Sequence, residues 1–152
     1  MPLAESYTQK AYEVLVMIKK YNILGDDFTA AGEASSDFKG ILKKLGISPE
    51  IIRKVSIAMY EAEINTIIHG GGGECVAEIE GKSIRVTFSD NGPGIANLDL
   101  AMQEGYSTAS DKIREMGFGA GMGLPNMMKY TDDMHIETAP GKGTTLTLIV
   151  NL

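Results

Sequence analysis

The spacing of apolar residues changes near residue 70, and this change limits the folds that the chain can adopt. Residues 38 to 45 place apolar side chains at intervals of three and four, which is the spacing of one helix face. Residues 84 to 89 instead alternate strictly between apolar and polar, as a half-buried strand does. Helices followed by hairpins predict an α+β fold, a two-layer sandwich in which helices cover one face of a mixed, mainly antiparallel sheet.

Turn and cap residues set the expected boundaries. Gly46 ends the first helix, and Ser48 with Pro49 begins a long second helix that stops at the glycines 70 to 73, interpreted as a turn. No boundary divides the chain, so we expect one domain over 1–152, with a strand and a helix in 1–47 and the motifs in 48–152. The other expected elements are a strand at 13–22, a hairpin of 75–80 with 84–89, helices at 97–105 and 124–130, and a hairpin of 134–138 with 144–150.

Composition narrows the class of protein. The 152 residues are 43% hydrophobic and 22% charged, which suits one soluble globular domain. The formal net charge of −6 disfavours nucleic acid as a partner, because phosphate-backbone binding needs clustered cations. Cys75 is the single cysteine, which excludes an internal disulfide, and neither a signal peptide nor a membrane-length apolar run is evident. We expect a cytoplasmic protein without a membrane partner.

The stretch GFGAGMGLPNM has glycine at every second position from 117 to 123 and then Pro125, a residue suited to the first turn of a helix. Its spacing fits neither the dinucleotide fingerprint G-x-G-x-x-G nor the P-loop, which closes with Gly-Lys-Ser/Thr. Unhindered amides before a helix form a ready anion site. A flexible surface loop explains the stretch equally well when it is taken alone.

Glu61 and Asn65 share one face of the long helix with three isoleucines at helical spacing. A carboxylate on an apolar stripe is costly unless it is paired or coordinated, so the pair could supply a general base and a metal ligand one turn apart. A partly exposed helix edge is the commoner explanation for one Glu/Asn pair. Glu63 points in another direction and is expected to be a solvated charge.

Two strand ends carry further candidates. Asp90 has the core-facing parity of its strand and leads into DNGPGI, where Gly92 and Gly94 let the backbone approach a flat ligand closely. An Asp-Asn-Gly turn explains the same residues. Thr144 has the inward parity of the last strand and would lie beside Asp90 if the two strands are neighbours, although β-propensity alone also accounts for a threonine there.

The segments EAEIN..IH, DNGPGI, GFGAGMGL and GKGTTL occur in this order, and together they resemble the GHKL superfamily of ATP-binding domains found in gyrase, histidine kinases and MutL. The resemblance spans residues 48 to 152. The IIHG sequence after the Glu/Asn helix and the GKGTT ending look most like the bacterial anti-sigma-factor serine/threonine kinases and switch kinases.

The resemblance implies roles for these residues. Glu61 would be the general base and Asn65 the ligand of a Mg²⁺ ion that also contacts the triphosphate. Asp90 would accept a hydrogen bond from the adenine amino group, with Thr144 completing the adenine end directly or through water. The adenine ring would lie against Gly92 and Gly94. Residues 106–116 would form an ATP lid, and the phosphates would be wrapped by Gly117, Phe118, Gly119, Ala120, Gly121, Met122, Gly123 and Leu124.

The function implied is an ATP- and Mg²⁺-dependent serine/threonine protein kinase that transfers the γ-phosphate to a small regulatory protein, anti-anti-sigma-like in character. One alternative is a nucleotide-gated module that binds a sigma-like factor with little catalysis. Another is a histidine-kinase-type ATPase domain, which is disfavoured because residues 1–47 show no dimerising coiled coil. A homodimer is one expected state, since such relatives often work as dimers.

Two histidines and a group of methionines are expected to be structural. His69 is interpreted as a helix-end residue satisfied by backbone groups, with a nucleotide contact the less favoured alternative, and His135 as a surface residue of a strand. The methionines at 116, 122, 127 and 128 are interpreted as adaptable packing.

Overall fold

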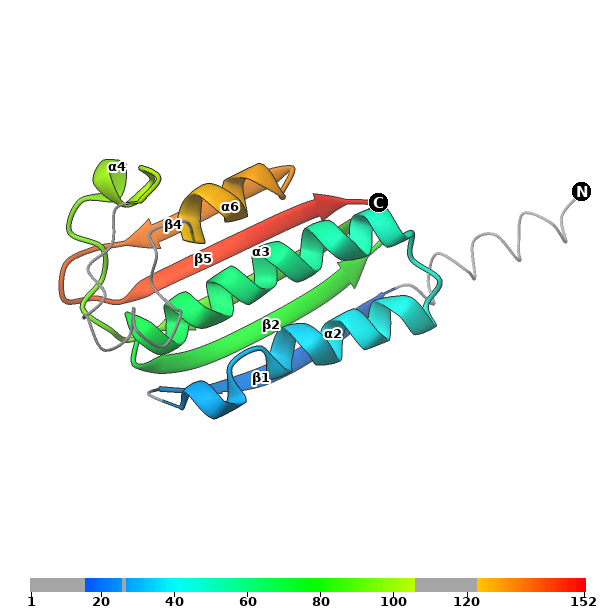
Figure 1. Cartoon of the computed structure of the whole chain (residues 1–152), viewed down its shortest axis with the longest axis horizontal. Helices are drawn as coiled ribbons and strands as arrows, with labels where there is room; N and C mark the ends of the chain where they lie inside the picture. Colours follow the sequence, from blue (N-terminus) through cyan, green and yellow to red (C-terminus); the bar gives the residue numbers. More distant parts are fainter. Residues whose placement is uncertain (1–15, 26, 106–122) are drawn as a thin grey trace, which may run out of the picture.

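A computed structural model describes residues 16–25, 27–105 and 123–152 as an open five-stranded sheet with helices on one face (Figure 1). The strand order is β1-β2-β3-β5-β4. This confirms the predicted α+β sandwich, but every pairing among the described strands is antiparallel, so the sheet is not mixed. The strands are β1 (Met17–Leu24), β2 (Gly72–Glu80), β3 (Ser83–Asp90), β4 (Asp133–Thr138) and β5 (Thr144–Asn151).

The helical layer is built around α3, which lies along the sheet between α2 and α6 and contacts both (Figure 1). None of the described helices combines the length and the apolar composition needed to cross a bilayer. The described helices are η1 (Phe28–Ala30), α2 (Glu33–Lys44), α3 (Pro49–Ile68), α4 (Leu98–Ala101) and α6 (Gly123–Lys129).

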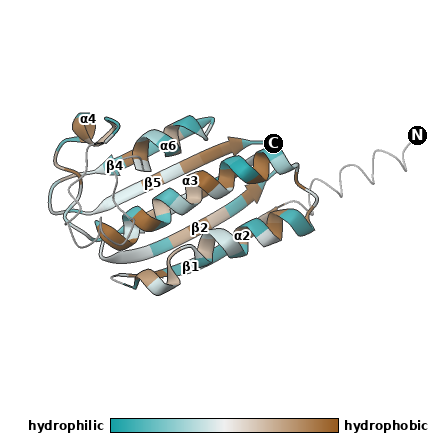
Figure 2. Cartoon of the chain, in the orientation of Figure 1, coloured by the Kyte–Doolittle hydropathy of each residue, from teal (hydrophilic) through white to brown (hydrophobic). Residues whose placement is uncertain are grey.

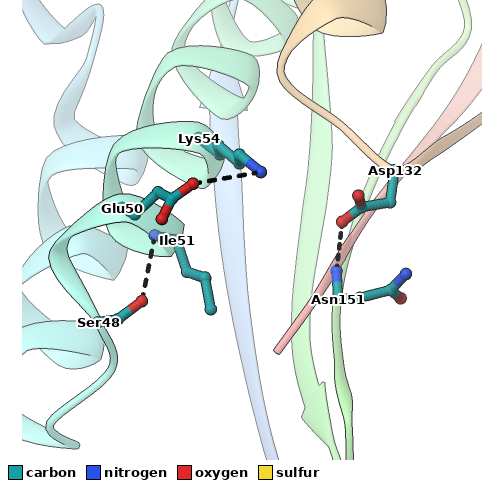
Figure 3. Close-up of polar contacts among 6 residues, drawn as sticks. All are labelled: Ser48, Glu50, Ile51, Lys54, Asp132 and Asn151. Carbon is teal, nitrogen blue, oxygen red and sulfur yellow. Dashed lines mark hydrogen bonds and ion pairs between the residues drawn. The ribbon is translucent and has the colours of Figure 1, made fainter.

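The predicted boundary between α2 and α3 is confirmed. Gly46 has φ +74°, the left-handed conformation that ends a helix. Ser48 caps α3, since its Oγ accepts a hydrogen bond from the Ile51 backbone N–H at 3.4 Å (Figure 3). Where β5 ends, the Asn151 backbone N–H donates to Asp132 Oδ2 at 2.7 Å (Figure 3).

The core lies between the sheet and the helical layer. Alternate residues of each central strand point inward and are buried, as the strand alternation predicted. Apolar and polar residues are interspersed along α3 (Figure 2), and its buried residues Ile52, Val55, Met59, Ala62 and Thr66 recur at intervals of three and four, so one face of the helix meets the sheet. The buried side chains include Cys75, Ala77 and Ile79 of β2, Ile84, Val86 and Phe88 of β3, Leu146, Leu148 and Val150 of β5, and Phe38, Leu42, Val55, Met59 and Ala62 of the helices.

Three predicted boundaries are wrong in detail. The first strand runs to Leu24 and not to residue 22, whereas its predicted start at residue 13 lies outside the described part of the chain. Gly72 and Gly73 are not in the turn after α3, because they already pair with β1 as the start of β2. The helix expected at 97–105 is a single turn, α4, which Asn97 caps by accepting a hydrogen bond from the Leu100 N–H at 3.1 Å.

Candidate functional site

The C-terminal half of α3 meets the start of α6, and this contact holds the Glu/Asn pair. Glu61 and Asn65 are both half-buried and lie one turn apart. A β-carbon at Gly123, the first residue of α6, would lie 3.1 Å from Nδ2 and 3.2 Å from Oδ1 of Asn65. One turn further along α6, Asn126 Nδ2 donates to Glu61 Oε1 at 3.4 Å. The pair therefore faces the helix that follows the glycine run, and sequence reasoning missed Asn126.

Asp90 and Thr144 are cross-strand partners where β3 ends and β5 begins, so the two strands are neighbours, which is the condition on which their expected proximity depended. Both are half-buried. Asp90 Oδ1 accepts hydrogen bonds from the backbone N–H of Gly92 at 2.9 Å and of Thr144 at 3.3 Å. Within the part of the chain that the structure describes, Asp90 Oδ2 accepts no hydrogen bond. One oxygen thus fixes the carboxylate, and the other can accept a bond from a ligand.

Gly70 joins the end of α3 to this carboxylate, and sequence reasoning missed it. A β-carbon at Gly70 would lie 2.6 Å from both Cγ and Oδ2 of Asp90. A β-carbon at Gly92 would in turn lie 2.9 Å from the Gly70 Cα. Only glycine at these two positions lets the helix end and the Asp90 loop approach so closely. The sole signal in the sequence was the four-glycine run, which also suits an ordinary turn.

The loop that contains Gly92 and Gly94 rests on the turn between β4 and β5. Gly94 has φ +75°, and a β-carbon there would collide with the Ala139 carbonyl oxygen. The Gly141 N–H donates to the Pro93 carbonyl at 2.7 Å. Two segments almost fifty residues apart in the sequence therefore form one backbone surface beside Asp90.

Thr138, the last residue of β4, links the same two segments through its side chain and was also missed from the sequence. Its Oγ1 accepts a hydrogen bond from the Ile95 N–H at 2.8 Å and donates one to the Gly143 carbonyl at 3.1 Å. The same atom lies 3.0 Å from the Thr144 hydroxyl. The half-buried Thr138 thus fixes the residue opposite Asp90.

The prediction that Glu63 is a solvated charge is wrong. Glu63 is 2% exposed, and its carboxylate accepts hydrogen bonds from the backbone N–H groups of Gly32 at 2.9 Å, Ala34 at 3.3 Å and Ser35 at 3.0 Å. These are free donors at the start of α2, where the helix dipole also favours negative charge. The N-terminus of α2 packs over this part of α3, which a helical pattern alone does not reveal.

The helix-end position of His69 and the surface position of His135 are as expected. His69 follows α3 as its C-cap, and its backbone N–H donates to the Asn65 carbonyl at 2.9 Å. Desolvation lowers the pKa of His69, and the charge of nearby Asp90 opposes that shift. His135 is exposed on β4, with Nε2 3.0 Å from Asp133 Oδ2, which confirms its assignment to the surface.

Part of the candidate site lies outside the described residues. Residues 106–116, the predicted lid, are among them, as are Gly117 to Met122 of the glycine run. Of the predicted phosphate-binding residues only Gly123 and Leu124 are described, and Leu124 is buried in the core. Of the four methionines, Met127 is fully buried and Met128 is exposed, while Met116 and Met122 are outside.

The side chains of the site suit a metal ion that is coordinated partly by the protein and partly by the phosphates of a nucleotide. No group of three His, Cys, Asp or Glu side chains forms a metal site within residues 16–25, 27–105 and 123–152. Mg²⁺ commonly takes one or two protein oxygens and fills its shell with phosphates and water. The side-chain oxygen of Asn65 fits that habit, and the Glu61 carboxylate lies one helical turn away. The acceptor-only Asp90 carboxylate fits an amino group at the other end of the site.

Comparisons with known proteins identify the family of the chain. The sequence model of the histidine kinase-, DNA gyrase B- and HSP90-like ATPase family matches residues 50–152. An anti-sigma F factor of Clostridium kluyveri is 36% identical over 97 residues, which are 60% of this chain and 65% of that protein. The serine/threonine-protein kinase RsbT of Bacillus subtilis is 27% identical over 115 residues, 73% of this chain and 80% of the kinase. The match thus spans just under two thirds of the first relative's length.

Solved structures share the fold. The SiaB–SiaC complex of Pseudomonas aeruginosa contains a chain with a TM-score of 0.58 and 12% identity, covering 98% of both chains. The structure of the RsbU and RsbW domains of a Mycobacterium tuberculosis protein gives a TM-score of 0.58 at 18% identity, covering 88% of this chain and 31% of that one. The family model matches most of the chain and its ATPase description implies ATP binding, so the predicted GHKL resemblance is confirmed: the chain belongs to the histidine kinase-, DNA gyrase B- and HSP90-like ATPase family.

Proposed function

We propose that the protein is an ATP- and Mg²⁺-dependent serine/threonine protein kinase of the anti-sigma-factor type, which phosphorylates a small regulatory protein. The observation that carries the proposal is the half-buried pair Glu61 and Asn65, one turn apart on the face of α3 that meets α6. A module that only binds nucleotide has no need of a carboxylate beside the metal ligand. Relatives named as an anti-sigma F factor and as a serine/threonine kinase support the same class.

The site divides into two ends. Asp90 Oδ2 would accept a hydrogen bond from the adenine amino group, with the ring against the backbone of Gly92 and Gly94. Asn65 would hold Mg²⁺ at the other end, close to Gly123, where the glycine run enters α6. The metal, when bound, supplies charge neutralisation for the phosphates.

Phosphoryl transfer asks the protein chiefly for positioning and electrostatic stabilisation. Glu61 would accept the proton of a serine or threonine hydroxyl on the partner as that oxygen bonds to the γ-phosphorus. The bond between the γ-phosphorus and the bridging oxygen breaks, and ADP leaves. Asn126, which donates to Glu61 Oε1, would hold the carboxylate in place.

A second candidate is a nucleotide-gated module that sequesters a sigma-like factor. The relatives named anti-sigma F factors favour it, because that name refers to a sigma factor and not to catalysis. The two candidates differ in what Glu61 does, since sequestration does not require a general base.

The test compares the wild type with Glu61→Ala and with Glu50→Ala. Glu50 is a matched control, because it lies on the same helix with its side chain 82% exposed. Each purified protein is mixed with γ-labelled ATP, Mg²⁺ and an extract of the source cells. We expect acid-stable label on one small protein with the wild type and the Glu50 variant. Loss of a general base lowers such a rate by roughly 10²–10⁴-fold, so Glu61→Ala should give almost none.

Nucleotide affinity is measured on the same proteins. Glu61→Ala should bind ATP as the wild type does, because the adenine end of the site, around Asp90, is intact. Equal phosphate transfer by Glu61→Ala and the wild type would show that Glu61 is not the general base. Absence of label with all three proteins, together with ATP-dependent retention of a partner by each, would replace the kinase with the sequestration module.

A further inference from the structure

The Thr138 hydroxyl lies where the loop around Ile95 meets the loop around Gly143, at the end of the site that contains Asp90. It accepts from the Ile95 N–H at 2.8 Å, donates to the Gly143 carbonyl at 3.1 Å and lies 3.0 Å from the Thr144 hydroxyl. A threonine hydroxyl has one proton and two lone pairs. In only one orientation of this hydroxyl are all three contacts hydrogen bonds at the same time.

The direction of each hydrogen bond follows from what the partners can do. A carbonyl oxygen only accepts, so the Thr138 proton goes to Gly143. One lone pair of Thr138 takes the Ile95 N–H, and the other must then take the proton of Thr144. With its own proton committed to Thr138, the Thr144 oxygen can offer a further partner only lone pairs.

Thr144 stands directly opposite Asp90 in the sheet. A carboxylate is also an acceptor, and Asp90 Oδ2 accepts no hydrogen bond from the described residues. Thr138 therefore leaves two hydrogen-bond acceptors at this end of the site, Asp90 Oδ2 and the Thr144 hydroxyl oxygen. An exocyclic amino group, which carries two N–H donors, suits such a place, whereas a carbonyl oxygen would face two acceptors.

We propose that Thr138 is a positioning residue that makes the site select a purine bearing an exocyclic amino group over its keto analogue. The inference rests on the proposed function in one respect, namely that Asp90 and Thr144 meet the base. Thr138 itself does not touch the nucleotide. It acts by directing the Thr144 proton and by holding the loop around Ile95, whose neighbour Gly94 lies against Ala139.

The experiment uses three variants of the whole chain. Thr138→Val removes the hydroxyl at nearly constant volume, and Thr138→Ser restores it. Thr147→Val is the matched control, because Thr147 lies on β5 with the opposite parity to Thr144 and so on the other face of the sheet. Calorimetry measures the affinity of each protein for ATP, inosine triphosphate and inorganic tripolyphosphate with Mg²⁺, and thermal unfolding is followed in parallel.

Loss of a half-buried hydrogen-bonded hydroxyl that leaves a donor unpaired should weaken ATP binding by Thr138→Val about tenfold. The preference for ATP over inosine triphosphate should shrink, because the freed Thr144 proton can then turn toward a keto oxygen. Tripolyphosphate affinity should stay unchanged, since it reports the phosphate end alone. Thr138→Ser and Thr147→Val should both keep the wild-type preference.

The outcomes that would overturn the inference differ from those that would overturn the proposed function. If wild type binds ATP but Thr138→Val keeps the same ratio of ATP to inosine triphosphate affinity, Thr138 has no role in selection. If Thr138→Val loses ATP and tripolyphosphate affinity by equal factors, its effect is general and the inference fails. If wild type binds neither ATP nor tripolyphosphate, the proposed function fails as well.

Discussion

Glu61 and Glu63 lie two positions apart on α3, yet their carboxylates contact different helices. Glu61 Oε1 accepts from Asn126 of α6 at 3.4 Å, whereas Glu63 accepts three backbone N–H groups at the start of α2, the closest at 2.9 Å from Gly32. Positions i and i+2 of a helix point in directions about 200° apart, so one helix can place one acid in the site and another in the core.

Glu63→Ala should destabilise the fold without acting on the site directly. It leaves three donors of α2 without their acceptor, and an unsatisfied buried donor costs about 1–3 kcal/mol, so we expect a loss of roughly 2–5 kcal/mol in the free energy of unfolding. Urea unfolding measures it. Glu50→Ala, on the same helix but exposed with Lys54 4.0 Å away, should change stability by less than about 1 kcal/mol. Equal effects of the two substitutions would contradict the capping role.

Gly70→Ala should weaken nucleotide binding while the fold is kept. The added methyl would lie 2.6 Å from Asp90 Oδ2, so the carboxylate must move, and ATP affinity should fall about tenfold or more, the worth of one hydrogen bond to a charged group. Gly40→Ala is the control: Gly40 lies within α2 with nothing within 4 Å of the added methyl, and alanine there should stabilise the helix by about 0.5–1 kcal/mol. Calorimetry with ATP and thermal unfolding separate the two effects, and unchanged ATP affinity in Gly70→Ala would show that Asp90 does not meet the base.

Cys75 should be inert in the folded protein. It is 0% exposed on β2, and burial, with the Glu63 charge acting in the same direction, raises the pKa of its thiol to about 12. A disulfide reagent at pH 8 should therefore react with it only after unfolding. Rapid reaction of the native protein would mean that this part of the sheet opens readily.

The same shift makes stability depend on pH. Above about pH 9 the thiol loses its proton in the unfolded state but keeps it in the folded state, which lowers the free energy of the unfolded state. The free energy of unfolding therefore falls by up to about 1.4 kcal/mol per pH unit, until the pH passes the pKa of the folded state. In Cys75→Ala this contribution disappears. The difference in unfolding free energy between wild type and Cys75→Ala should be constant below pH 9 and should shift against wild type above it. A difference that stays constant up to pH 11 would refute the assignment.

The elements that sequence reasoning predicted well are those set by local periodicity. Asp90 and Thr144 followed from strand parity, because a register with a period of two fixes which face a side chain takes. The boundary between α2 and α3 followed from Gly46 and Ser48, whose conformations are local requirements.

What escaped prediction depends on segments that meet only in the folded chain. Helical spacing set the direction of Glu63 but not what covers it, and the N-terminus of α2 lies there. Gly70 and Thr138 matter because of contacts with Asp90 and Ile95, which lie about twenty and more than forty residues away. Such contacts leave no periodic signal in a single sequence, so residues of this kind were interpreted as turn or strand positions.

Asp90→Asn offers the sharpest separation of fold from function. Asp90 Oδ1 accepts the N–H groups of Gly92 and Thr144, and the amide oxygen of asparagine can take both bonds in the same place. The amide nitrogen then replaces Oδ2, so the position that should accept an amino proton becomes a donor. We expect a midpoint of thermal unfolding close to that of the wild type and a loss of ATP affinity of about a hundredfold, because a charge-assisted bond is replaced by two opposed donors.

Calorimetry with ATP and with inosine triphosphate measures the change on Asp90→Asn. The substitution should leave the affinity for inosine triphosphate unchanged, because its keto oxygen can accept a hydrogen bond from the new amide. The difference in affinity between the two nucleotides should therefore narrow or reverse. Tripolyphosphate, which lacks a base, should bind as it does to the wild type. If a folded Asp90→Asn protein keeps the wild-type preference for ATP, the adenine base does not bind at Asp90. The roles assigned to Gly70, Thr138 and Thr144 at that end of the site would then also be wrong.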